Sequence, residues 1–168
     1  DGRPGEVARY AVRTGEYEAF ARATGTALPR PPAGRHDDSA PVVNVTQEEA
    51  RAFCDWLSRR DGVQYRLPTM SELQALVETL GAAEADPEVW AEENWHTAAL
   101  IGGLKAHYLC EWTGETEEIE RHDGPPRILG SIFYPPWMRH GSNHTNAQAH
   151  LLSTEGYSFV TFRVARSL

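Results

Sequence analysis

The segment that decides the fold is residues 41–57, which read Pro41-Val-Val-Asn-Val-Thr-Gln-Glu-Glu-Ala-Arg-Ala-Phe-Cys-Asp-Trp-Leu57. Within it, Thr46 and Glu49 have the spacing of a capping box, in which each side chain accepts a hydrogen bond from the other residue's backbone N–H. Apolar residues then recur at the i, i+3, i+4, i+7 spacing of an amphipathic helix: Ala50, Phe53, Cys54 and Leu57. The segment therefore predicts a capped helix with one buried face, ending before Gly62.

Two further helices are expected on either side of this one. Thr69 and Glu72 repeat the capping box, and the apolar stripe behind them consists of Leu73, Leu76, Val77 and Leu80, with Gly81 as the C-terminal stop. An earlier helix is predicted from Thr14, taken as its N-cap, to Gly25. Residues 63–67 are expected to form a short strand-like link.

The second half of the chain favours strands and loops. Strands are predicted at 108–112, 127–134 and 157–165, with loops at 114–126 and 135–156. The last strand alternates, so one face is expected to be buried: Val160, Phe162 and Val164.

The chain resembles the formylglycine-generating enzyme (sulfatase-modifying factor) family, a branch of the C-type-lectin-like fold. Beyond residues 41–57, the resemblance rests on Tyr65-Arg-Leu-Pro-Thr69 with Glu72, Cys110-Glu-Trp-Thr113, Arg127-Ile-Leu-Gly-Ser131 and Phe162-Arg-Val164. It implies an α+β fold with two main helices, short twisted antiparallel strands and much loop. We expect a single domain over residues 1–168.

Length and charge narrow the function classes. A chain of 168 residues is large enough for one well-packed domain. Its net charge of −8 and the lack of a basic stripe disfavour nucleic-acid binding. No membrane-spanning run and no signal peptide are visible, so we expect a cytoplasmic domain taken from a longer chain, with neighbouring domains.

The resemblance implies a catalytic copper site that this chain lacks. Formylglycine-generating enzymes bind copper through two cysteines that follow the Gly-Gly-Ser strand, but residues 131–140 contain no cysteine. Cys54 is interpreted as a buried thiol, although the sequence leaves a disulfide with Cys110 open. We therefore expect no cofactor, no metal and no enzymatic activity.

The long segment around residues 132–158 is instead predicted to bind a ligand, most simply a protein. It mixes rigid aromatic side chains with small polar ones, as recognition surfaces do. The predicted contact residues are Tyr134, Trp137, Arg139, His140, Asn143, His144, Asn146 and Tyr157. No Glu-Pro-Asn or Gln-Pro-Asp triplet of a calcium-dependent lectin is present.

A related hypothesis concerns variation in this surface. Variable proteins of diversity-generating retroelements share the fold, and residues 134–158 are rich in amino acids that adenine mutation of an Asn codon produces. Trp137 and Met138 do not arise in that way and would belong to the constant scaffold.

The histidines leave open an alternative function, that of a metal-dependent enzyme. His140, His144 and His150 lie in one segment and are interpreted as solvated loop residues. If they held a metal instead, the domain would be a metal- or oxygen-dependent enzyme of the formylglycine-generating or sulfoxide-synthase type with altered ligands.

Overall fold

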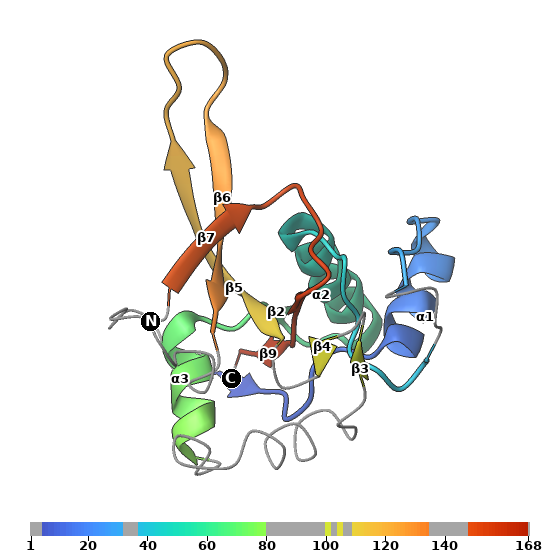
Figure 1. Ribbon diagram of the computed structural model, residues 1–168. Helices are drawn as coiled ribbons and strands as arrows, with labels where there is room; N and C mark the ends of the chain where they lie inside the picture. The colour runs from blue at the N-terminus through green and yellow to red at the C-terminus, as the bar shows by residue number, and fades with distance from the viewer. Residues whose placement is uncertain are drawn as a thin grey trace.

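The computed structural model describes residues 5–31, 37–79, 100–101, 104–105, 109–134 and 148–167. These residues form three helices and nine strands (Figure 1). In chain order the elements are β1 (Glu6–Val7), α1 (Thr14–Thr24), α2 (Gln47–Asp61), β2 (Tyr65–Arg66), α3 (Met70–Thr79), β3 (Leu100–Ile101), β4 (Leu104–Lys105), β5 (Cys110–Ile119), β6 (Arg127–Phe133), β7 (Gln148–Leu152), β8 (Val160–Thr161) and β9 (Ala165–Arg166). The α+β prediction is confirmed.

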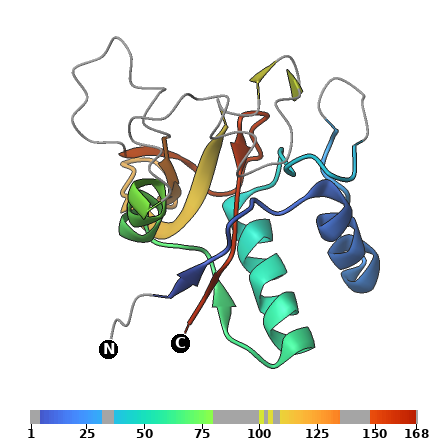
Figure 2. The same cartoon turned by 90° about the horizontal axis from the view of Figure 1, so that it is seen from below.

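The strands form a central region between the helices. One sheet has the order β7-β6-β5-β8, a second has the order β1-β9-β2, and β3 pairs with β4. Helices α1 and α2 lie on one side of the strands and α3 on the other (Figure 2). Because β1 and β2 both pair with β9, the first and last described strands lie side by side.

The capping boxes predicted for α2 and α3 are present. The Thr46 hydroxyl accepts a bond from the Glu49 backbone N–H at 3.0 Å, and the Glu49 carboxylate accepts one from the Thr46 N–H at 2.8 Å. Thr69 and Glu72 make the same reciprocal pair at 3.2 and 2.8 Å. Gly62 ends α2 with φ of 68°, a conformation that favours glycine.

The start of α1 differs by one residue from the prediction. Arg13 is the N-cap, and its backbone N–H donates to the Glu16 carboxylate at 2.8 Å. The Thr14 hydroxyl instead donates to the Ala40 carbonyl, because residues 37–40 lie against the helix start. The predicted stop at Gly25 is confirmed, whereas the predicted stop of α3 at Gly81 lies outside the described residues.

An aromatic cluster joins α1 and α2 to the C-terminal segment. The Tyr17 and Phe53 rings stack with centroids 5.9 Å apart, and Phe53 meets Phe162 edge-on at 5.5 Å. All three side chains are buried. Contacts of this kind contribute about 0.5–1.5 kcal/mol each beyond the area they bury.

Both loop predictions in the second half of the chain were wrong in part. The expected loop at 114–126 begins as strand, because β5 continues to Ile119 and pairs with β6 as far as Arg127. A bulge between Trp112 and Thr116 interrupts this pairing. The expected loop at 135–156 contains β7, which pairs with β6.

The C-terminal segment does not have one buried and one exposed face. Val160, Thr161, Phe162 and Arg163 are all buried, and the chain forms two short strands, β8 and β9, in different sheets. Since this segment passes between the two sheets, both of its faces are covered.

Candidate functional site

The structure describes two of the eight predicted contact residues, Tyr134 and Tyr157. The other six lie outside the described residues: Trp137, Arg139, His140, Asn143, His144 and Asn146. What the structure does establish is how both ends of this segment are held.

The segment begins and ends on adjacent strands of the four-stranded sheet. Phe133, the last residue of β6, pairs with Glu111 on one side and with Gln148, the first residue of β7, on the other. The chain therefore leaves the sheet at Tyr134 and returns at Gln148, at the end of the sheet where β5 and β8 begin. Strand pairing therefore fixes the two points between which residues 135–147 run.

Tyr134 and Cys110 lie at this sheet end. Tyr134 is partly buried against the core, and burial, with a smaller contribution from Cys110, raises the pKa of its phenol. Cys110 is fully buried, and burial followed by the nearby Glu111 raises the pKa of its thiol to about 12.

Cys54, on α2, is in a similar state. Burial is the main cause, followed by the charge of Asp55, that raises the pKa of this thiol to about 12. Both cysteines are free and buried, so the buried-thiol interpretation is confirmed and the open question of a disulfide is answered. Thiols of this kind are protonated at neutral pH, whereas copper requires thiolates, so these residues do not fit the family's copper site.

Tyr157 is held by the turn that follows β7. Its ring packs on Trp112 with centroids 6.1 Å apart and on Phe159 at 5.7 Å, and its carbonyl accepts a bond from the Asn44 N–H at 3.0 Å. A Cβ on the preceding Gly156 would lie 2.4 Å from the Asn44 carbonyl oxygen, so this close approach requires glycine. Tyr157 is therefore a fixed side chain.

Asn44, within the segment that decides the fold, has φ of 61°. Asparagine tolerates this left-handed conformation better than other non-glycine residues do. Its side-chain amide donates to the Arg30 carbonyl at 2.7 Å. The family-like motif at 41–57 thus shapes the backbone turn that holds Tyr157.

A groove lies beside Tyr157. The hairpin of β5 and β6 projects from the body of the molecule (Figure 1). The outer half of this hairpin, β7 and Tyr157 line an open groove of about 540 Å³. The sequence did not reveal this groove, because Ile119, Arg121 and the lining residues of β7 were assigned to loops.

Arg163, in the Phe162-Arg-Val164 motif, has a structural role. The fully buried Arg163 guanidinium donates to the Glu111 carboxylate at 2.5 and 2.6 Å and to the carbonyls of Ala8 and Arg9 at 3.1 and 2.9 Å. This arginine therefore joins β5, the N-terminal segment and the C-terminal segment.

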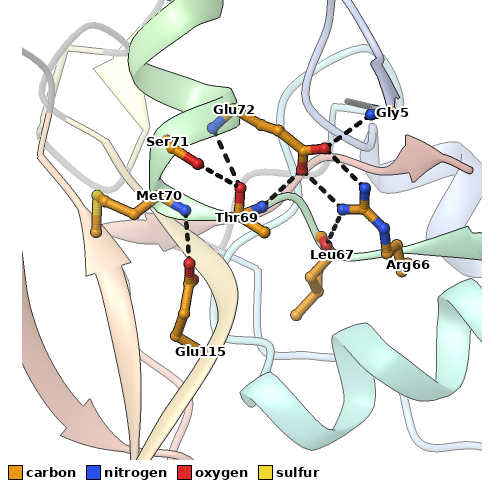
Figure 3. Close-up of polar contacts among 8 residues, drawn as sticks. All are labelled: Gly5, Arg66, Leu67, Thr69, Met70, Ser71, Glu72 and Glu115. Atoms are coloured by element: carbon orange, nitrogen blue, oxygen red, sulfur yellow. Dashed lines mark hydrogen bonds and ion pairs between the residues drawn. The ribbon is translucent and has the colours of Figure 1, made fainter. Parts of the chain in front are cut away.

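The Tyr-Arg-Leu-Pro-Thr motif supports a second such junction (Figure 3). The Glu72 carboxylate accepts two bonds from Arg66 at 2.7 Å, one from the Thr69 N–H at 2.8 Å and one from the Gly5 N–H at 3.0 Å. These bonds, with that of Arg66 the largest cause, lower the pKa of Glu72 to about 2.

The structure also bears on metal binding and membrane insertion. The described residues contain no cluster of three or more histidine, cysteine or acidic side chains able to hold a metal ion. His150 lies 3.6 Å from Glu117, and its proposed companions His140 and His144 lie outside these residues. Within the same part of the chain, no helix is long and apolar enough to span a membrane.

Residues 3–118 match the model of the sulfatase-modifying factor enzyme 1-like domain. The chain belongs to this family. It is also similar in structure to PvdO from Pseudomonas aeruginosa, with a TM-score of 0.65 and 17% identity over 96% of this chain and 80% of PvdO. CarF has a TM-score of 0.61 and 15% identity over 96% of this chain and 86% of CarF. At these identities the likeness shows a shared fold. No curated protein matches the sequence significantly.

Proposed function

We propose that this sulfatase-modifying factor-like domain is a non-catalytic ligand-binding module, and that residues 132–158 form its contact surface. The observation that carries the proposal is the state of the two cysteines. Both are buried in the core with thiol pKa values raised to about 12. Neither is suited to be the thiolate that copper or a nucleophilic mechanism needs.

The anchoring of the surface supports a binding role. Strands β6 and β7 hold its first half, and the contacts of Tyr157 with Trp112 and Asn44 hold its end. A surface with fixed ends loses less entropy on binding than a free segment does. The sequence between the anchors supplies Trp137 and Arg139, which are residue types enriched at protein interfaces.

The partner that we propose is a protein in the cytoplasm. Aromatic and arginine side chains dominate the binding energy of protein interfaces, and this segment contains Tyr134, Trp137 and Tyr157 together with Arg139. Diversification of these codons by a retroelement would explain the mixture of residue types. It would appear in the gene's surroundings as a near-copy of codons 127–163 that differs mainly at adenines.

The test of the binding role replaces Trp137 by a photo-reactive amino acid in the cell that naturally produces the protein. We expect one protein to cross-link from this position and none from a matched position at Arg22, an exposed residue of α1. The purified partner should then bind the Trp137→Ala, His140→Ala double variant at least tenfold more weakly. Equal affinity for a folded double variant would refute the site.

A separate measurement addresses the enzyme alternative. The purified domain is incubated with Cu(I), Fe(II) or Zn(II) in turn, desalted and analysed for metal content. We expect no stoichiometric retention. One metal per chain that is lost in the His140→Ala, His144→Ala variant would overturn the non-catalytic proposal in favour of a metal-dependent enzyme.

A further inference from the structure

The groove beside the outer half of the projecting hairpin has apolar side chains from one face of three strands. Residues paired across neighbouring strands share a face of a sheet. Ile119 pairs with Arg127, and Leu129 is opposite both Glu117 and Leu152, so Ile119, Leu129 and Leu152 lie on the same face. Tyr157 closes this row of side chains.

Some of the apolar side chains in the groove are more exposed to solvent than apolar side chains usually are. Ile119 is 44% exposed, and it is one of three large apolar side chains with this degree of exposure among the described residues. Leu129, Leu152 and Tyr157 are each partly exposed. Apolar side chains gathered in a concave site favour a ligand that covers them.

The charged side chains that line the groove are basic. Three basic side chains line it, Arg121, Arg127 and His150, and no carboxylate does. The Arg127 guanidinium forms no hydrogen bond or ion pair with the described residues. Arg121 and His150 have only long contacts, at 3.9 Å to Asp123 and 3.6 Å to Glu117, and these two carboxylates are 85% and 57% exposed. The charged side chains that line the groove are therefore basic, with the Glu117 and Asp123 carboxylates beside them.

We propose that this groove binds an extended segment of a partner protein in which acidic side chains alternate with large apolar ones. The apolar side chains would cover Ile119, Leu129 and Leu152, and a carboxylate would pair with Arg127. An open groove suits a peptide segment better than an enclosed small molecule. A second copy of the chain fits less well, because two chains of charge −8 repel each other.

The inference rests on the proposed binding function in one respect, since β7 and Tyr157 belong both to the groove and to residues 132–158. The two can nevertheless fail separately. The groove test alters Arg127 and Ile119, which lie outside residues 132–158, whereas the cross-linking test uses Trp137. If one of these two experiments fails, the other still tests its own site.

The experiment uses two labelled peptides, Gly-Asp-Phe-Asp-Leu-Asp-Gly and its counterpart with lysine at every aspartate. Binding is followed by fluorescence anisotropy and by amide chemical shifts of the ¹⁵N-labelled domain. We expect the acidic peptide to bind and to shift the amides of Leu129 and Leu152. Arg127→Gln should weaken binding about tenfold, as expected for loss of one charge-assisted hydrogen bond.

Two further variants make the result specific. Arg59→Gln removes the same charge from the exposed end of α2 and should leave binding unchanged. Ile119→Ser, at a side chain that is 44% exposed, should also weaken binding. The proposal is overturned if neither peptide binds, if both bind equally, or if Arg59→Gln acts like Arg127→Gln. If the chain instead dimerises with increasing concentration and Ile119→Ser abolishes the dimer, the groove binds a second copy, and the proposal is overturned as well.

Discussion

Replacing Glu72 by glutamine is the most informative single change, because its carboxylate joins three segments of the fold. It accepts two bonds from Arg66 in β2, one from Thr69 before α3 and one from Gly5 before β1 (Figure 3). Glutamine has nearly the same shape but carries no charge. Its single carbonyl oxygen cannot replace both carboxylate oxygens, so the ion pair with Arg66 is lost.

The expected loss of stability in Glu72→Gln follows from the pKa of Glu72. Folding lowers this pKa from 4.5 to about 2. A shift of that size corresponds to about 3.4 kcal/mol at about 1.36 kcal/mol per unit. Solvent screens the interaction, since the Arg66 side chain is 33% exposed. We therefore expect Glu72→Gln to lower the free energy of unfolding by about 2 kcal/mol at pH 7.

The pH dependence has a definite sign. Because the pKa is lower in the folded state, the stabilisation by Glu72 is complete above pH 4.5 and declines as the pH falls towards 2. The difference between wild type and variant should therefore fall to less than half its neutral value by about pH 3. Urea unfolding followed by tryptophan fluorescence at several pH values measures it.

The matched control is Glu78→Gln, at an exposed residue of the same helix. We expect it to change the free energy of unfolding by less than about 0.5 kcal/mol. An equal effect of Glu72→Gln at pH 3 and pH 7, or an effect no larger than that of the control, would refute the reasoning.

Three other predictions concern the core and the turn at Tyr157. Arg163→Met should destabilise the protein by about 3–5 kcal/mol, because it leaves Glu111 charged and buried, and adding Glu111→Leu should recover part of that loss in thermal unfolding. Gly156→Ala should lower the free energy of unfolding by more than about 2 kcal/mol, because the new Cβ would lie 2.4 Å from the Asn44 backbone oxygen. Gly124→Ala is the control and should be nearly neutral in the same thermal unfolding assay, because the nearest atom to its Cβ would be 3.6 Å away. Both thiols should resist Ellman's reagent in the native protein at pH 8 and react fully in urea, and fast native labelling would contradict the burial of the cysteines.

Local sequence determined the helices of this protein. Thr46 with Glu49, and Thr69 with Glu72, specify their helix starts because capping partners lie three residues apart and need no distant contact. The same residues carry the family resemblance, which is why the fold class could be predicted. The α1 N-cap was misplaced by one residue because a distant group, the Ala40 carbonyl, takes the Thr14 hydroxyl.

Only the tertiary structure decided the strands and the groove. The charged residues of β5 become strand because β6 pairs with them, and alternation along 157–165 could not show that both faces would be covered. The partner of Arg163, Glu111, lies 52 residues away in sequence. Similarly, the groove joins Ile119 to Leu152 through a strand register that no local pattern encodes. Helix signals act over a single turn, whereas strand pairing and clefts depend on which distant segments meet.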